Sequence, residues 1–195
     1  DIHPSISLCL GPCDISVSEM VSAYTAFPMK GVRRSPLLVT HIEDSDGNIV
    51  AQFAPRVREV ISEEAAYKMI VLMQGVMNGG TGSRMRNRYK IMADMGGKTG
   101  TTNDNSDGWF IGYTPTLSFG AWVGGDERDI HFASMALGQG ANSALPIVAN
   151  FLNKVYADNT LGYSPEDKFD IPPGFDPCAN VYGEGEDGVT IAEFK

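Results

Sequence analysis

The sequence has few basic residues and no long apolar run. It contains 15 Lys and Arg against 24 Asp and Glu, which gives a formal net charge of −9. Nucleic-acid binding begins with cations that neutralise phosphates, so this balance argues against a nucleic-acid partner. No apolar stretch reaches the roughly 18 residues that a membrane-spanning helix needs. We therefore expect neither nucleic-acid binding nor a membrane span in these residues.

Cysteine and histidine are also scarce. Cys9, Cys13 and Cys178 are an odd number, and the sequence has no Cys-x-x-Cys pair and no His/Cys cluster. A bridge between Cys9 and Cys13 and free thiols both stay open. Because clustered ligands are absent, we expect no metal and no cofactor. The three histidines are widely spaced and form no evident catalytic triad.

What the sequence does have is the pattern of an ordinary globular protein. Its 195 residues are 43% hydrophobic, enough for one good-sized domain or two small ones. Apolar periodicity and turn residues predict three helices, one hairpin and a three-stranded meander: helices at 14–29, 62–78 and 143–157, a hairpin around Asp46-Gly47, and strands at 95–102, 108–114 and 118–124. The expected fold class is α+β, an antiparallel sheet flanked by helices.

Two of the helices have a clear apolar face. Helix 62–78 begins at the N-cap candidate Ser62, and its core-facing residues are predicted to be Ala66, Ile70, Met73 and Met77. Helix 143–157 is expected to carry four apolar residues toward the core, namely Ile147, Phe151, Leu152 and Val155.

Two charged segments are interpreted as surface. The stretch 82–90 contains Arg84, Arg86, Arg88 and Lys90 and is predicted to be an exposed loop, with an anionic ligand as the less favoured alternative. Residues 158–195 are acidic and rich in proline and glycine, and are expected to form a loosely structured extension beyond a domain spanning 1–157.

The tetrapeptide Gly97-Lys98-Thr99-Gly100 invites a comparison with the phosphate-binding loop. That motif needs a glycine five residues before Gly97, where Met92 stands, and it should open a helix. Here the chain continues through a polar turn into the strand-like Gly108–Tyr113. A nucleotide site is therefore rejected.

The alternative is the Lys-Thr-Gly strand of penicillin-recognising serine acyltransferases. In a strand, side chains alternate, so Lys98 and Gly100 should share one face and Thr99 and Thr101 the other. Gly100 lets an acyl donor lie close to the backbone, and an edge strand offers free N–H and C=O groups to pair with it. A lysine there can assist proton transfer and attract a carboxylate.

The surrounding sequence resembles the bifunctional (class A) penicillin-binding proteins. The block KTGTTNDNSDGWFIGYTPTLSFGAWVGGDE is similar to their KTGTT, polar turn, D-x-W-F-x-G-Y-T-P and W-V-G pattern. The segments QGVMNGGTG, ISVSEMVSAYTAF and IEDSDGNIV also resemble theirs, so the resemblance covers roughly residues 5–155. It implies part of the transpeptidase fold that these proteins share with β-lactamases.

The resemblance also implies a function. The family cross-links peptidoglycan stem peptides and is acylated by β-lactams, on the periplasmic face of the inner membrane. By motif match, Lys98 assists proton transfer, Thr99 and Thr101 bind the donor carboxylate, and the Thr101 N–H supplies half of an oxyanion hole. Gly100 lies against the donor, and Thr102 is a more distant candidate for substrate binding.

The sequence departs from the family in one respect. No serine has lysine three residues on or asparagine two residues on, so Ser-x-x-Lys and Ser-x-Asn are both absent. We expect the chain to be the carboxy-terminal part of a transpeptidase domain, inactive alone, whose amino-terminal half supplies the serine, two strands and, further upstream, the membrane anchor. The strand at 118–124 should then have an unpaired edge, and one side of the sheet should lack cover.

Two other functions stay open. One is a D,D-carboxypeptidase or β-lactamase-like hydrolase, which would use the same fold to hydrolyse the acyl-enzyme. The other is a non-catalytic peptidoglycan-binding module, which would also lack the serine.

Overall fold

The computed structural model describes residues 5, 6, 8, 11 and 13–176. Among the described residues, three α-helices and four short strands precede the central sheet, and two α-helices follow it. The elements run in the order α1 (Val17–Tyr24), β1 (Val32–Arg34), β2 (His41–Glu43), β3 (Ile49–Gln52), β4 (Val57–Glu59), α2 (Glu63–Asn78), α3 (Arg84–Asn87), β5 (Gly96–Thr101), η2 (Asn103–Asn105), β6 (Asp107–Tyr113), β7 (Ser118–Gly124), α4 (Met135–Gly138), α5 (Ala144–Ala157) and η3 (Asn159–Leu161).

The central sheet is the antiparallel meander β5-β6-β7. Lys98 is paired with Ile111, and Ile111 with Gly120. The three strands predicted at 95–102, 108–114 and 118–124 are thus confirmed, and so is the α+β class. Within the described residues β7 pairs with β6 alone, so the expected unpaired edge at 118–124 is confirmed there.

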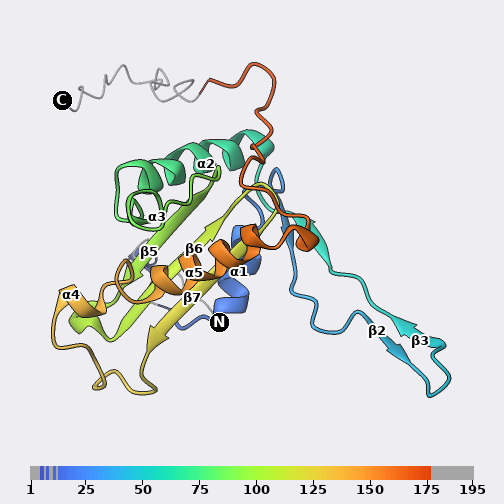
Figure 1. Cartoon of the computed structure of the whole chain (residues 1–195), viewed down its shortest axis with the longest axis horizontal. Helices are drawn as coiled ribbons and strands as arrows, with labels where there is room; N and C mark the ends of the chain where they lie inside the picture. Colours follow the sequence, from blue (N-terminus) through green and yellow to red (C-terminus); the bar gives the residue numbers. More distant parts are fainter. Residues whose placement is uncertain (1–4, 7, 9–10, 12, 177–195) are drawn as a thin grey trace.

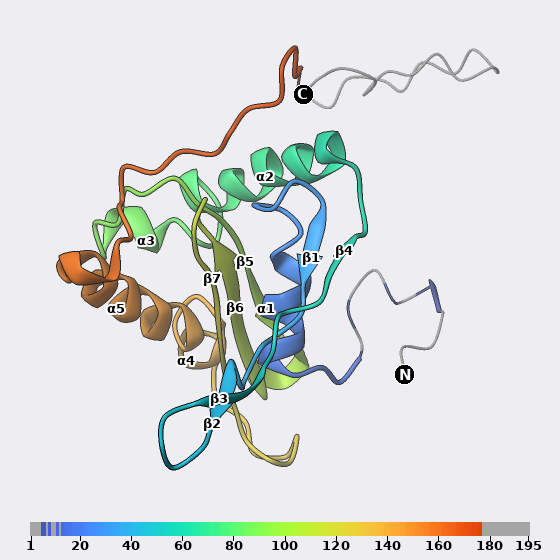
Figure 2. The same ribbon diagram turned by 90° about the vertical axis from the view of Figure 1, so that its right-hand side faces the viewer.

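Helices cover both faces of this sheet. Figure 2 shows the sheet nearly edge-on, with α5 against one face and α1 against the other, while α2 crosses one end. The expectation that one side lacks cover is therefore wrong for the middle of the sheet, where α1 packs on β6 and β7. It is correct at the Thr101 end, because α1 has only eight residues and leaves Trp122 38% exposed.

Two apolar clusters form the core. The larger lies between α2, α3, β6 and α5 and contains fully buried Phe110, Met77 and Leu152. The smaller surrounds Tyr113, whose ring packs against Phe27 and Phe169. Burial raises the pKa of the Tyr113 phenol, because the charged form would lose its hydration.

The buried face of α2 is the one predicted from the sequence. Ala66, Ile70, Met73 and Met77 are its buried residues, and the Ser62 hydroxyl accepts a hydrogen bond from the Ala65 N–H. This prediction is confirmed because the apolar spacing and the cap are both local signals.

The face of α5 differs from the prediction. Leu152 and Val155 are buried, whereas Ile147 and Phe151 are 52% and 47% exposed. The helix instead buries its small side of Ala144, Val148 and Ala149 against the sheet. Small side chains let the helix approach the sheet closely, so the bulkier pair is turned outward.

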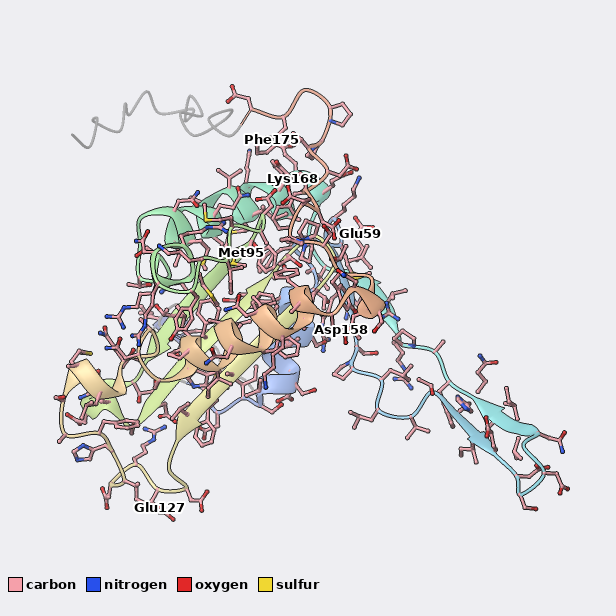
Figure 3. The ribbon with its side chains drawn as sticks, viewed as in Figure 1. Glu59, Met95, Glu127, Asp158, Lys168 and Phe175 are labelled. Atoms are coloured by element: carbon pink, nitrogen blue, oxygen red, sulfur yellow. The ribbon has the colours of Figure 1, made fainter. Side chains whose placement is uncertain are left out.

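The predicted hairpin is present as β2 and β3, with Gly47 at φ 82° in its turn. The strands that flank this hairpin in the chain, β1 and β4, also pair with each other in antiparallel fashion. The sequence did not predict this second pair. Figures 1 and 3 show the hairpin reaching away from the rest of the molecule, with its side chains in open space.

The segment 82–90 is not simply an exposed loop. It contains the short helix α3, and Arg86 donates hydrogen bonds to the carbonyl oxygens of Ile91 and Ala93. Burial lowers the pKa of the Arg86 guanidinium. This arginine holds the chain that enters β5, so the predicted run of exposed cations is wrong at Arg86.

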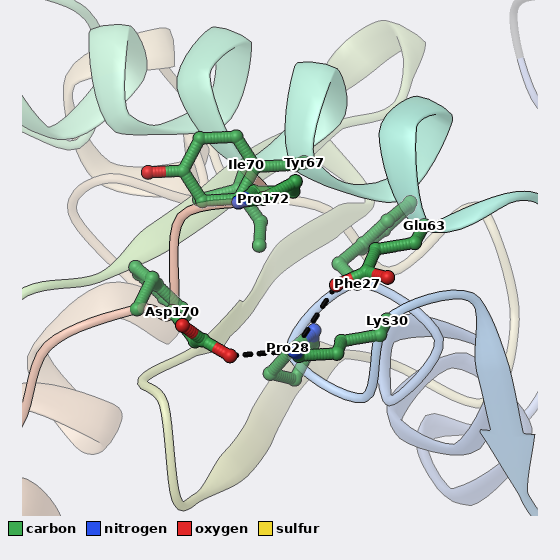
Figure 4. A pocket seen from close by; sticks show the side chains of 9 residues that line it. Phe27, Pro28, Lys30, Glu63, Tyr67, Ile70, Asp170 and Pro172 are labelled. Carbon is green, nitrogen blue, oxygen red and sulfur yellow. Dashed lines mark hydrogen bonds and ion pairs between the residues drawn. The ribbon is translucent and has the colours of Figure 1, made fainter. Parts of the chain in front are cut away.

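Residues 158–176 have little regular structure but pack back onto the molecule. Phe169 is buried beside Tyr113, and the Phe175 ring meets Tyr67 edge-on at 4.5 Å. Asp170 forms an ion pair with Lys30, which also pairs with Glu63 at 3.0 Å (Figure 4). The cavity between them is only about 20 Å³, roughly one water molecule. The boundary at 157 stays a prediction.

Some predictions fall on residues that are not described. Cys9 and positions 177–195, which include Cys178, lie outside the described residues, so most of the acidic segment stays a prediction. Cys13 is described and is a free cysteine, so of the two alternatives the free thiol is confirmed at that residue. Among the helices that are described, none has the length and apolar character required to cross a membrane.

Candidate active site

The strand β5 carries the Lys-Thr-Gly motif and lies at the edge of the sheet. Within the described residues it pairs only with β6, which leaves its other side free. Gly96 and Gly97 lead into the motif, and an added Cβ at Gly96 would come within 2.6 Å of the Tyr113 hydroxyl. The two residues that lead into the motif are therefore glycines, because the strand packs directly on the core at this point.

Side chains of the motif alternate as predicted. A Cβ at Gly100 would meet the Trp109 side chain, which places Gly100 and Lys98 on the face of the two tryptophans. On the opposite face, the Thr101 hydroxyl accepts a hydrogen bond from the Gly140 N–H at 3.1 Å. The alternation of Lys98 and Gly100 against Thr99 and Thr101 is confirmed.

The backbone of β5 presents polar groups to its free side. The Thr102 N–H donates to the Asp107 carbonyl at 3.1 Å, which fixes the phase of the ladder. In an antiparallel pair, every second residue directs its N–H and C=O groups toward the partner strand. Since Thr102 does so, the N–H and C=O groups of Thr99 and Thr101 point away from β6. An extended peptide can pair with these groups as an additional strand.

Lys98 is exposed at this edge. Its Nζ donates to the Thr99 carbonyl oxygen at 2.9 Å, across the free side of the strand. The side chain thus lies along the edge where an extended peptide would pair.

The hydroxyls of Thr99 and Thr101 are each held by a neighbouring loop. The Thr99 Oγ1 lies 2.6 Å from the Thr81 Oγ1, in the turn between α2 and α3. The Thr101 Oγ1 is bonded by Gly140, in the turn between α4 and α5. No pattern in the sequence points to Thr81 or Gly140, because both are distant from the motif along the chain and only the fold places them at β5.

Thr102 is separated from the other motif residues. Its hydroxyl accepts from the Asp107 N–H at 2.8 Å and lies within hydrogen-bond distance of the Ser106 and Asp107 side chains. These contacts close the turn that joins β5 to β6. The structure thus brings together Lys98, Thr99, Gly100 and Thr101, and places the Thr102 hydroxyl in the turn.

A hollow of about 320 Å³ lies at the same end of the sheet. It is lined by Asp14, Ser106, Asp107, Trp122, Gly125, Asp126 and Arg128. The Trp122 Nε1 donates to Asp107 at 2.7 Å, and the Trp109 and Trp122 rings lie 6.4 Å apart. Among the described residues, no three His, Cys, Asp or Glu side chains form a group that could hold a metal ion.

Comparison with known proteins agrees with this geometry. The family profile described as "Penicillin binding protein transpeptidase domain" matches residues 3–156. The chain belongs to that family.

Curated relatives of this transpeptidase-family chain are several times longer. Penicillin-binding protein 1A of Aquifex aeolicus is 31% identical over 173 residues, 89% of this chain but 22% of the relative. Penicillin-binding protein 1A of Rickettsia typhi is 29% identical over 97% of this chain and 26% of its own length. The chain therefore spans about a quarter of the length of these relatives.

Solved structures share the fold. Penicillin-binding protein 1A from Haemophilus influenzae superimposes with a TM-score of 0.75 at 24% identity, over 87% of this chain and 30% of that one. The D,D-transpeptidase domain of a peptidoglycan glycosyltransferase from Eggerthella lenta gives a TM-score of 0.56 at 24% identity, over 73% and 32%. The expected penicillin-binding-protein fold is confirmed.

Proposed function

We propose that this chain is the carboxy-terminal part of a serine D,D-transpeptidase that cross-links peptidoglycan stem peptides and binds β-lactams. The observation that carries the proposal is the edge strand β5. It combines the Thr99 and Thr101 N–H groups, which point away from β6, with the Lys98 ammonium and two threonine hydroxyls on one strand. That set suits an extended acyl donor that ends in a carboxylate.

Each group has a part in the proposed reaction. A serine from an upstream segment attacks the penultimate D-Ala carbonyl, and the terminal D-Ala leaves. An amine of a second stem peptide then takes the acyl group. Lys98 assists proton transfer, while the hydroxyls of Thr99 and Thr101 bind the donor carboxylate.

The Thr101 N–H is proposed as one of two oxyanion donors. It points away from β6, and one such donor lowers the barrier by about 3 kcal/mol in comparable sites. Gly100 keeps the strand open to the donor. The Thr102 hydroxyl is engaged with Asp107, so its proposed contribution is to hold the turn that follows the site.

The partners follow from this chemistry. We propose that the chain works with an amino-terminal half of its domain, because Ser-x-x-Lys and Ser-x-Asn are absent from its sequence. A membrane anchor and a glycosyltransferase domain would lie further upstream, and the site would face the periplasm, where peptidoglycan is assembled. The chain alone should be inactive.

A fluorescent penicillin tests the proposal. The chain is incubated with it alone and together with the upstream half of the domain, and covalent label is read on a denaturing gel. We expect label on the upstream half only in the mixture, and expect Lys98→Ala to abolish it. Lys154→Ala is the matched control, since Lys154 is an exposed lysine in the last turn of α5.

The other outcomes identify the alternatives. A mixture that never labels would support the non-catalytic peptidoglycan-binding module. A label that is released by water, with no transfer to an added amine, would support the carboxypeptidase or β-lactamase. Label on this chain itself would mean that one of its own serines is the nucleophile, and the roles above would be wrong.

A further inference from the structure

Thr81 lies against the face of β5 that carries the Thr99 side chain, in a turn held by backbone hydrogen bonds. The turn follows α2, and its backbone is fixed by hydrogen bonds from the Gly80 N–H to the Gly75 carbonyl and from the Gly82 N–H to the Val76 carbonyl. An added Cβ at Gly80 would come within 2.9 Å of the Val76 Cα. Thr81 is thus held between two glycines that pack on the last turn of α2.

The hydroxyl of Thr81 meets the hydroxyl of Thr99 at 2.6 Å. Each hydroxyl has one proton to donate and two lone pairs that accept. If Thr81 donates, the Thr99 proton is free for another acceptor. If Thr99 donates, its proton is used within the pair and it presents only lone pairs, which repel a carboxylate.

Thr101 shows the same arrangement with its direction already settled. The backbone N–H of Gly140 can only donate, so the Thr101 hydroxyl oxygen is the acceptor and its proton is free. Gly140 has no room for a side chain, since a Cβ there would overlap the carbonyl oxygens of Trp109 and Gly100. The two hydroxyls on this face of β5 are each bonded from behind by a different loop.

We propose that Thr81 is a positioning residue, which donates to Thr99 and so turns the Thr99 hydroxyl into a donor toward the carboxylate of the acyl donor. The inference rests on the proposed function, because it assigns Thr81 a part in binding that carboxylate. Gly140 does the same for Thr101. Together the two loops make β5 present two hydroxyl protons, which suits one carboxylate with two oxygens.

The test uses the natural protein at its full length and two probes, benzylpenicillin and its uncharged methyl ester. The rate of acylation by each is measured for wild type, Thr81→Val, Thr81→Ser, Thr99→Val and the double variant Thr81→Val/Thr99→Val. Valine matches threonine in shape and lacks the hydroxyl, whereas serine keeps it. The ester rate shows that each variant is folded and competent for acylation.

We expect Thr81→Val to slow acylation by benzylpenicillin about tenfold, the lower end for a hydrogen bond to a charged group. The methyl ester offers only neutral acceptors, so its rate should fall by about twofold, the lower end for a hydrogen bond between neutral groups. Thr81→Ser should restore the rate. In the double variant, Thr81→Val should add nothing to Thr99→Val, because Thr81 acts through Thr99.

Three results would contradict these statements in distinguishable ways. If Thr81→Val reacts with benzylpenicillin as wild type does, the inference fails while the proposed function stands. If both probes slow equally, Thr81 is merely structural, and the inference fails again. If wild-type protein reacts with neither probe, the proposed function itself fails, and the inference with it.

Discussion

Replacing Leu152 by alanine tests whether α5 is the helix that closes the main core. Leu152 is fully buried in the cluster with Phe110 and Met77. The substitution removes three carbon atoms, worth about 2.4 kcal/mol of transfer free energy at about 0.8 kcal/mol each. The cavity left behind raises the expected loss of unfolding free energy to roughly 3 to 4 kcal/mol.

Phe151 is the matched control because it is the adjacent residue on the same helix. Its side chain is 47% exposed, so Phe151→Ala should cost less than about 1 kcal/mol. Urea unfolding followed by the fluorescence of Trp109 and Trp122 measures both. With a slope of about 2 kcal/mol per M, Leu152→Ala should lower the midpoint by roughly 1.5 to 2 M and Phe151→Ala by less than about 0.5 M. An equal or larger shift for Phe151→Ala would refute the placement of α5.

The remaining predictions concern the turn behind β5 and the ion pairs of Lys30. Gly140→Ala should lose about 1 to 3 kcal/mol in urea unfolding, because the new Cβ meets backbone that cannot yield. Gly75→Ala in α2, where a Cβ meets nothing within 4 Å, should instead gain about 0.5 to 1 kcal/mol, and equal losses for both would count against the close packing. The hydrogen bonds that the Lys30 ammonium donates to Asp170 and, second, to Glu63 raise the pKa of Lys30. Its stabilising contribution is therefore complete below the ordinary lysine pKa of 10.5 and is lost as pH rises through the higher folded-state pKa. The difference between the urea midpoints of wild type and Lys30→Met should therefore shrink above about pH 10.5. Buried tyrosines titrate in both proteins, so their effect cancels in this difference. A difference that stays constant would show that the ion pairs do not stabilise the fold.

Local signals in the sequence determined most of the elements and the family. The cap at Ser62 and the spacing from Ala66 to Met77 specified α2 and its buried face, because helix periodicity needs no knowledge of distant partners. Short polar links around 103–107 and 114–117 required antiparallel neighbours, which made the meander predictable. The motif at Lys98 identified the edge strand and its alternation.

Only the tertiary structure decided which residues surround that strand. Thr81 and Gly140 reach β5 from turns that are 18 and 39 residues away from their hydroxyl partners, and no pattern in the sequence links them. The outward position of Ile147 and Phe151 was equally hidden, since both faces of α5 are apolar and the closer packing of Ala144 and Ala149 on the sheet selected one of them. The structural use of Arg86 depends on carbonyl oxygens that the fold brings to it. Periodicity fixes what a segment can bury, whereas the shape of the opposing surface fixes what it does bury.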